Sequence, residues 1–164
     1  MLVGVISDTH GYFHSRLPKV FASVEKIIHL GDIGSKEVFE RLCELAPVIA
    51  IKGNNEPEPI PQALPDPSLI ELAGRKIFLT HRLLTMDWEQ IKDALLRSSS
   101  LPFPEVDMVL FGHTHYPVWD KIKGIYFLNP GYAGSDPLEG KPTCALLEIS
   151  PHSISAQIVN LSGF

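Results

Sequence analysis

Apolar residues in the first fifty positions follow two different patterns. Residues 2–6, 26–30 and 47–51 are short, mainly apolar runs, which is typical of strands buried on both faces. Between them, residues 16–24 and 38–45 carry apolar side chains at helical spacing, and Ser35 is placed to cap the second helix. This alternation of strand and helix predicts right-handed crossovers and a parallel sheet.

The second half of the chain begins with a proline-rich segment, residues 56–67. Proline excludes a helix or a central strand there, so we expect a stiff surface crossing between two half-sheets. The tripeptide Ala73-Gly74-Arg75 then predicts a hairpin between strands at 69–72 and 76–80. A helix is expected at 87–97, and further strands at 106–111, 118–121, 125–128, 143–149 and 154–159.

Composition narrows the class of protein. A chain of 164 residues with 45% hydrophobic and 20% charged residues is typical of one globular domain, spanning residues 1–164. Its 14 Lys and Arg against 19 Asp and Glu give a net charge of −5, which disfavours a grip on nucleic acid. Apolar runs are too short for a membrane span, and the first residues lack a signal-peptide pattern. We therefore expect a cytoplasmic protein without membrane or nucleic-acid partners.

The two cysteines are too few for a disulfide framework. Cys43 lies in a predicted helix and Cys144 in an apolar predicted strand. Both are therefore expected to be buried thiols.

Polar residues that can bind metal ions follow five of the predicted strands. They are Asp8, His10, Asp32, Asn54, His81, His113 and His115. Because the carboxyl ends of strands in an open α/β sheet share one edge, we expect these side chains to converge. Glycine precedes Asp32, Asn54 and His113, and it is expected to allow a sharp exit from each strand with a positive φ.

Two imidazole-rich metal sites fit this set better than one. Mixed imidazole and carboxylate ligands suit Mn, Fe, Zn, Co or Ni better than Mg or Ca. Seven ligands exceed the need of one open site, and they suit two ions about 3.5–4 Å apart that share a carboxylate. An isolated Asp or Asn at a strand end is usually a turn residue, and one Asp-x-His pair is common by chance. Five such cases on one predicted edge favour a metal centre.

These motifs occur in the order found in a known family. Asp8-x-His10, Gly31-Asp32, Gly53-Asn54, His81 and Gly112-His113-Thr114-His115 resemble the calcineurin-like metallophosphoesterases, most closely their small bacterial and archaeal phosphodiesterase branch. Asn129-Pro130-Gly131 also matches that branch. The resemblance implies an α/β fold: a four-layer α-β-β-α sandwich of two mixed sheets flanked by helices, with the metal site at the carboxyl ends of the strands.

The resemblance also implies roles for the candidate ligands. Asp8, His10 and His115 would bind a first divalent ion, Asn54, His81 and His113 a second, and Asp32 would bridge the two. Mn²⁺ is the first expectation for both ions, with Ni²⁺, Fe²⁺, Zn²⁺ or Co²⁺ as alternatives. The implied activity is hydrolysis of a small phosphate ester, most simply a phosphodiester, by a hydroxide that bridges the metals.

Three residues depart from the family pattern. Many relatives carry His or Cys after the Gly-Asn pair, whereas this chain has Asn55, which cannot protonate a leaving group. We therefore predict faster hydrolysis of nitrophenyl than of alkyl esters, and equal rates would refute this. Arg82-Leu83 stands where the branch usually has a Gly-His pair after the first histidine, and Arg82 is either a phosphate contact, together with Asn54, or a solvated side chain. Tyr132 stands where the branch usually has Ser.

Alternatives to a phosphodiesterase remain at this stage. A protein-interaction scaffold on the same fold, similar to the retromer subunit of this superfamily, is one, although retention of all seven ligands favours an enzyme. A phosphomonoesterase is another, and a free sheet edge could support a homodimer. Of the remaining histidines, we expect His14 at the surface, His29 hydrogen-bonded in the core and His152 in a hairpin turn.

Overall fold

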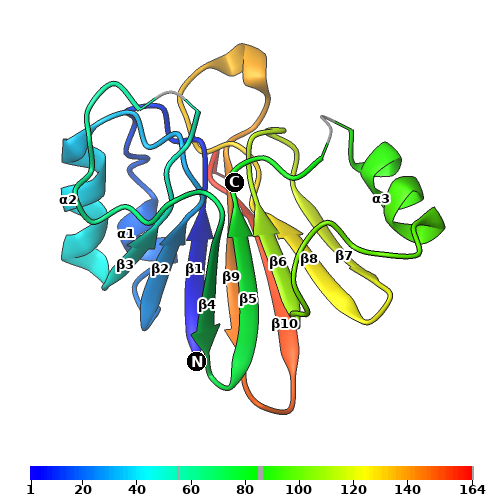
Figure 1. The fold of residues 1–164 in the computed structure, drawn as a ribbon. Coiled ribbons are helices and arrows are strands. Elements are labelled where there is room, and N and C mark those ends of the chain that lie inside the picture. Colours follow the sequence, from blue (N-terminus) through cyan, green and yellow to red (C-terminus); the bar gives the residue numbers. More distant parts are fainter. Residues whose placement is uncertain (55, 85–86, 164) are drawn as a thin grey trace.

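The computed structural model describes residues 1–54, 56–84 and 87–163 (Figure 1). Within these ranges the strands are β1 (Leu2–Ile6), β2 (Lys26–His29), β3 (Val48–Ala50), β4 (Ser68–Leu72), β5 (Arg75–Thr80), β6 (Met108–Phe111), β7 (Val118–Ile122), β8 (Ile125–Asn129), β9 (Thr143–Ile149) and β10 (Ile154–Asn160). The helices are α1 (Leu17–Val20), α2 (Lys36–Leu45), α3 (Trp88–Arg97) and the short 3₁₀ helix η1 (Pro137–Glu139).

The strands form two mixed five-stranded sheets. The first has the order β10-β9-β1-β2-β3, and the second has the order β4-β5-β6-β8-β7. Each sheet contains three neighbouring parallel strands, β1 to β3 in the first and β5, β6 and β8 in the second. The remaining strands pair antiparallel at the sides. The predicted parallel sheet is confirmed, and the proline-rich crossing joins β3 of one sheet to β4 of the other.

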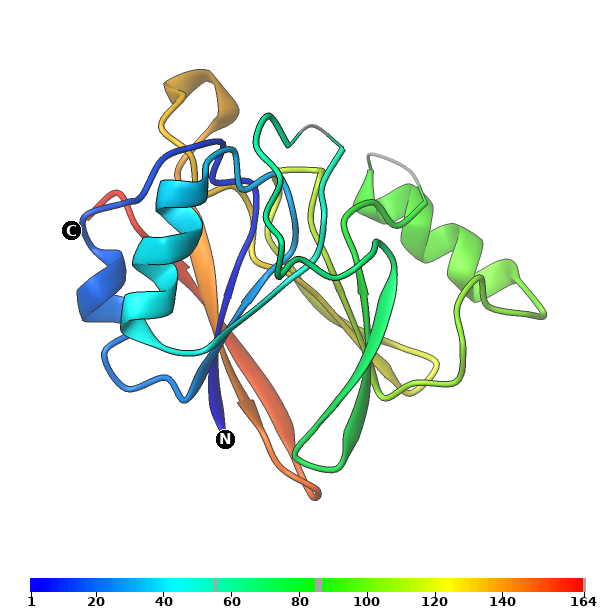
Figure 2. The ribbon, with the colours of Figure 1, turned by 60° about the vertical axis from the view of Figure 1, so that its left-hand side comes forward.

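Three apolar cores correspond to the three contacts of a four-layer sandwich. Helices α1 and α2 pack on the outer face of the first sheet, where Phe21 and Leu42 meet Ile27. Val5 and Leu110 belong to a second core between the two sheets. Helix α3 covers the outer face of the second sheet with Ile91 and Leu95 (Figures 1 and 2). The predicted α-β-β-α architecture is therefore confirmed.

Side-chain caps define where the two longer helices begin. Ser35 accepts a hydrogen bond from the backbone N–H of Val38 at 3.2 Å, as expected for the start of α2. Asp87 accepts from the backbone N–H groups of Glu89 and Gln90 and so caps α3.

Two local predictions are wrong. The predicted helix at 16–24 ends at Val20, and its later residues turn back toward β2, although Phe21 and Val24 are buried as their spacing predicts. Cys43 is exposed rather than buried, because it follows the buried Leu42 on α2 and lies outside the apolar stripe of that helix. Cys144 is buried, as predicted, and burial raises the pKa of its thiol to about 12.

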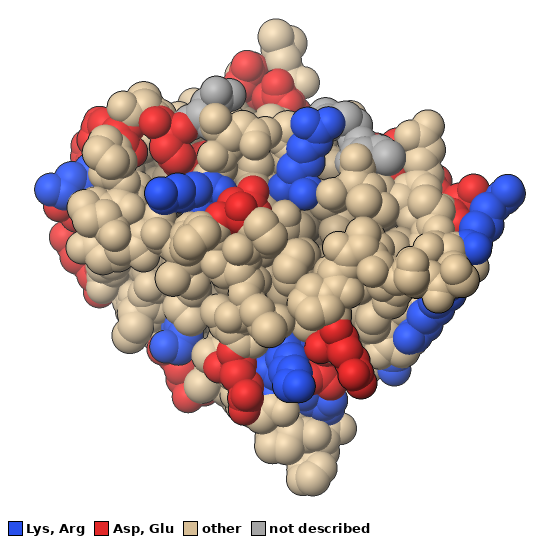
Figure 3. Space-filling model, in the orientation of Figure 1, with Lys and Arg blue, Asp and Glu red and all other residues tan. Residues whose placement is uncertain are grey.

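The parallel strands of both sheets run toward the same end of the sandwich, at the top of Figure 1. On the face shown in Figure 3, Lys and Arg side chains lie in small groups beside Asp and Glu side chains. Among the described residues, no helix combines the length and apolar character needed to cross a membrane.

Candidate metal centre

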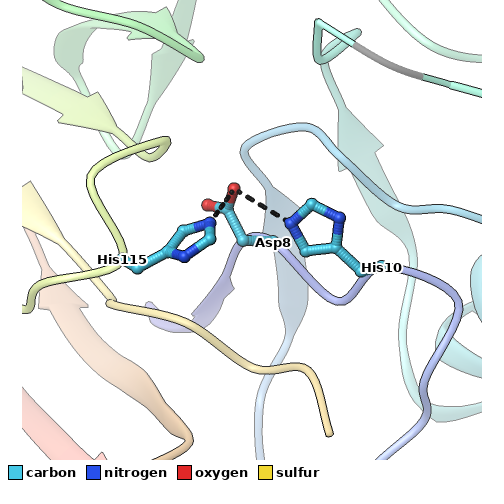
Figure 4. A group of neighbouring side chains, drawn as sticks. All are labelled: Asp8, His10 and His115. Atoms are coloured by element: carbon cyan, nitrogen blue, oxygen red, sulfur yellow. Dashed lines mark ion pairs between the residues drawn. The ribbon is translucent and has the colours of Figure 1, made fainter. Parts of the chain in front are cut away.

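Asp8 lies at the centre of the first group of candidate ligands. Its side chain is fully buried just beyond β1, and its Oδ1 atom lies 3.3 Å from Nε2 of His115 and 3.7 Å from Nε2 of His10 (Figure 4). Its Oδ2 atom accepts hydrogen bonds from the hydroxyl of Ser7 at 2.5 Å and from the backbone N–H of His113 at 3.1 Å. The second oxygen is thus anchored by the protein, and the first faces two imidazoles.

Asp32 and His81 lie at the centre of a second group. Oδ2 of Asp32 is 3.2 Å from Nε2 of His81 and 3.9 Å from Nε2 of His10, so this carboxylate lies between the two groups. The His113 ring packs edge-on against that of His81, with centroids 5.2 Å apart. Nδ2 of Asn54 lies 3.3 Å from Nδ1 of His113. The structure therefore brings together all seven residues that the sequence nominated.

Two buried atoms in this cluster have no hydrogen-bond partner among the described residues: Oδ1 of Asp8 and Nε2 of His81. Nδ1 of His81 lies 2.7 Å from the carbonyl oxygen of Leu30, which can only accept, so Nδ1 carries the proton. In the neutral imidazole the lone pair is then on Nε2, and it points toward the carboxylates of Asp8 and Asp32. Opposed lone pairs in a buried site call for a cation, so these residues fit a divalent metal ion.

The backbone at the candidate ligands is unusual. Five of them adopt a positive φ: Asp8 (54°), His10 (44°), Asp32 (54°), His113 (68°) and His115 (65°). This left-handed region is costly for residues other than glycine, by about 1–2 kcal/mol each, and such outliers cluster at functional sites. These strained backbone conformations direct the five side chains toward one another.

The glycines before the ligands act differently from our prediction. Gly31 has the expected positive φ of 98°, but Gly53 and Gly112 do not. A Cβ atom on Gly53 would lie 2.1 Å from Oδ1 of Asp32, and one on Gly112 would lie 2.2 Å from Oγ of Ser7. These two glycines are needed because the loops approach each other closely, and after Gly112 the left-handed conformation falls on His113 instead.

The charges of the group are strongly coupled. Burial alone would raise the pKa of Asp8, but the neighbouring imidazoles of His10 and His115 outweigh burial and hold that pKa well below its usual range. The contact with Asp8, assisted by Glu139, raises the pKa of His115 to about 9. Burial lowers the pKa of His113, and the nearby positive charge of Arg82 lowers it further.

A family model described as a calcineurin-like phosphoesterase superfamily domain matches residues 1–152. The chain belongs to the calcineurin-like phosphoesterase superfamily. It is 37% identical over 137 residues to a probable metallophosphoesterase of Methanocaldococcus jannaschii, covering 80% of this chain and 67% of that protein.

Two solved structures of similar proteins cover nearly the whole of this chain. An archaeal phosphodiesterase is 27% identical, with a TM-score of 0.69 over 98% of this chain and 99% of the other. Vps29 from Entamoeba histolytica, in complex with Zn²⁺, is also 27% identical, with a TM-score of 0.68 over 99% of this chain and 100% of the other. The superfamily assignment and the sandwich fold thus agree.

Glu56 fixes two loops that carry candidate ligands to each other. Its carboxylate accepts from the backbone N–H groups of Ile33 at 3.0 Å, Gly34 at 3.1 Å and Gly53 at 3.3 Å. Ile33 follows Asp32 and Gly53 precedes Asn54, so a single carboxylate sets the distance between the loops after β2 and β3. Sequence reasoning missed this role because Glu56 lies in the proline-rich segment, which shows no strand or helix pattern.

Two further polar residues anchor the ligand loops of the second sheet. Oδ1 of Asp66 accepts from the backbone N–H of His81 at 2.9 Å. The buried amide of Asn129 donates to the carbonyl oxygen of Gly112 at 3.1 Å and to Oγ1 of Thr114 at 3.0 Å. The Asn-Pro-Gly motif noted in the sequence therefore stabilises the loop that carries His113 and His115.

The other residues singled out from the sequence have varied positions. His29 is fully buried beside Thr9, with Nε2 2.9 Å from the Thr9 hydroxyl, and His152 lies exposed in the β9–β10 turn, both as predicted. His14 is partly exposed. Arg82 is exposed next to His81, and Asn55 lies outside the described residues.

Proposed function

We propose that this protein is a dinuclear metal-dependent phosphodiesterase that hydrolyses a small phosphate ester. The observation that carries the proposal is a pair of buried atoms, Oδ1 of Asp8 and Nε2 of His81, which have no hydrogen-bond partner among the described residues and lie 4.0 Å apart. A purely structural cluster would satisfy such atoms with hydrogen-bond donors.

Each candidate ligand has a distinct part in this proposal. Asp8, His10 and His115 would hold one divalent ion, Asn54, His81 and His113 would hold a second, and Asp32 would contact both. Two bound ions supply Lewis acidity, and they lower the pKa of water enough for attack on phosphorus near neutral pH. Mn²⁺ is our first candidate for both positions.

The chain itself would bind and orient the ester. An open hollow of about 540 Å³ beside the centre is lined by His10, Gly34, Asn54, Glu56 and Pro57. The net charge of −5 does not attract an anionic ester, so the metal ions and Arg82, with its planar guanidinium fork, would provide that attraction. An open hollow of this size suits a small ester, and the similar archaeal phosphodiesterase favours a diester.

Metal-dependent hydrolysis is the direct test. EDTA-stripped protein should hydrolyse bis-nitrophenyl phosphate only after Mn²⁺ is added, and it should act more slowly on nitrophenyl phosphate, a monoester. Metal analysis of the reloaded protein should give two ions per chain. Failure to bind Mn²⁺ and to hydrolyse either ester would refute the proposal. Faster hydrolysis of the monoester would instead change the proposed substrate class from a diester to a monoester.

A pair of substitutions assigns the activity to this centre. Asp32→Asn removes the shared charge and should reduce turnover by at least about 100-fold, because both ions would be held less firmly. Asp93→Asn makes the same chemical change at an exposed position on α3, where Asp93 pairs with Arg97, and it should leave turnover unchanged. Equal turnover in the two variants would exclude Asp32 as the bridge.

The likeness to Vps29 favours a second candidate function, a protein-binding scaffold on the same fold. A scaffold with a structural metal ion would bind Mn²⁺ or Zn²⁺ without hydrolysing esters. Metal binding with no turnover across a panel of phosphodiesters and monoesters would therefore support the scaffold.

A further inference from the structure

The segment that follows β8 rises over the candidate metal centre. It contains Tyr132 and the short helix η1, and it forms the orange loop at the top of Figure 1. Two of its side chains, Tyr132 and Glu139, contact His115, which belongs to a different loop after β6. This segment therefore touches a candidate ligand without supplying one itself.

Glu139 contacts the ring nitrogen of His115 that faces away from Asp8. Oε2 of Glu139 lies 2.5 Å from Nδ1 of His115, while Nε2 of the same ring lies 3.3 Å from Oδ1 of Asp8. A carboxylate at Nδ1 can only accept, so it holds a proton on that nitrogen. When a metal ion displaces the proton on Nε2, the lone pair is thereby confined to the nitrogen that faces Asp8 (Figure 4).

The segment is itself ordered by contacts that place Glu139. The hydroxyl of Tyr132 accepts from the backbone N–H of Asp136 at 3.0 Å, and Oδ1 of Asp136 accepts from the backbone N–H of Leu138 at 2.9 Å. The Tyr132 ring, which is 3% exposed, lies 4.8 Å from the His115 ring and 5.9 Å from the His10 ring, measured between centroids. Tyr132 thus packs against two candidate ligands and holds η1 above them.

We propose that Glu139 is a positioning residue for metal binding, which holds His115 with Nε2 directed at Asp8 while Tyr132 keeps the segment in place. The inference rests on the proposed function, because it assigns these residues to the ion held by Asp8, His10 and His115. The second group uses a different device, since Nδ1 of His81 is held by the backbone carbonyl of Leu30. Loss of Glu139 should therefore weaken the binding of one ion and leave the binding of the other unchanged.

Calorimetric titration of Mn²⁺ into EDTA-stripped protein tests this directly. Glu139→Ala should raise the Kd of one of the two ions by about 10-fold to 100-fold, the usual effect of removing a partner of a ligating histidine. Glu139→Gln should have a smaller effect, because its amide oxygen can still accept from Nδ1–H. Tyr132→Phe, which removes only the hydroxyl, should raise the same Kd by about threefold to tenfold.

Glu105→Ala is the matched control, because Glu105 is exposed on a loop and outside the candidate centre. A Glu139→Ala variant with the two Kd values of the control would overturn the inference and leave the proposed function intact. Wild-type protein that binds no Mn²⁺ would overturn both.

A spectroscopic readout separates positioning from a general loss of stability. In Zn²⁺-loaded protein, the Nδ1-bound proton of His115 should give a protected, downfield imidazole resonance, which the Glu139→Ala variant should lack. Retention of that resonance in Glu139→Ala would also overturn the inference.

Discussion

The carboxylate of Glu56 offers the sharpest test of how the ligand loops are held. It accepts three backbone hydrogen bonds, from Ile33, Gly34 and Gly53, and connects the loops that carry Asp32 and Asn54. A hydrogen bond to a charged group contributes about 1.5–3 kcal/mol. Because Glu56 is only partly buried, we expect Glu56→Ala to lower the free energy of unfolding by about 3 kcal/mol, below the full sum of three bonds.

The expected effect of Glu56→Gln is smaller and follows from which oxygen is lost. Oε1 serves both Ile33 and Gly53 and can be retained by the amide, whereas Oε2 serves Gly34 and would be replaced by a donor. The loss should be about 1.5 kcal/mol. In a domain of this size each kcal/mol shifts Tm by about 2–4 °C, so Tm should fall by about 3–6 °C for Glu56→Gln and 6–12 °C for Glu56→Ala.

Urea unfolding of EDTA-stripped protein measures these changes without contributions from bound metal. Glu58→Ala is the control, because exposed Glu58 lies in the same segment and accepts one hydrogen bond, from Lys36. It should change stability by less than about 0.5 kcal/mol. A Glu56→Ala variant within that same margin of wild type would refute the reasoning, because the three bonds would then contribute nothing.

Three further outcomes are expected. Gly53→Ala should abolish tight Mn²⁺ binding in calorimetry, because its Cβ atom would collide with the Asp32 carboxylate; unchanged binding would mean that the loops can separate. Burial lowers the pKa of His29 to about 3, so between pH 6.5 and 3 only the unfolded chain takes up this proton. As the pH is lowered through that window, the free energy of unfolding should therefore fall by up to about 1.4 kcal/mol per pH unit. His29→Gln should remove this part of the pH dependence in urea titrations. Arg82→Ala should raise KM for bis-nitrophenyl phosphate more than it lowers kcat, and no change in either constant would show that Arg82 is merely solvated.

Apolar runs predicted the strands well because the parallel strands are buried on both faces. Strands β1 and β9 have the predicted bounds, and the other strands differ by one or two residues at an end. Helix α1 was predicted too long because buried residues at helical spacing also occur in the irregular turn through Phe21 and Val24. Periodicity reports which side chains face the core, and it does not report where backbone hydrogen bonding stops.

The candidate ligands could be nominated from sequence because each lies within four residues of the end of a strand. The residues that hold them could not, since their partners are distant along the chain. Glu139 is 24 residues from His115, and Glu56 is 23 residues from Ile33. Such contacts depend on how loops from separate crossovers meet, which local patterns do not encode. The positive φ values of Asp8, His10 and His115 were missed for the same reason, and the one predicted at Gly112 falls on His113 instead.

The left-handed backbone conformation at the candidate ligands reduces the stability of the fold while it positions the side chains of the site. At positions such as His10, His113 and His115, glycine would relieve the torsional cost, so a chain selected for stability alone would drift toward losing these imidazoles. Each histidine in such a conformation therefore lowers the stability of the folded chain. A chain that no longer used the centre would gain stability by shedding it, and this chain has kept every one of these side chains.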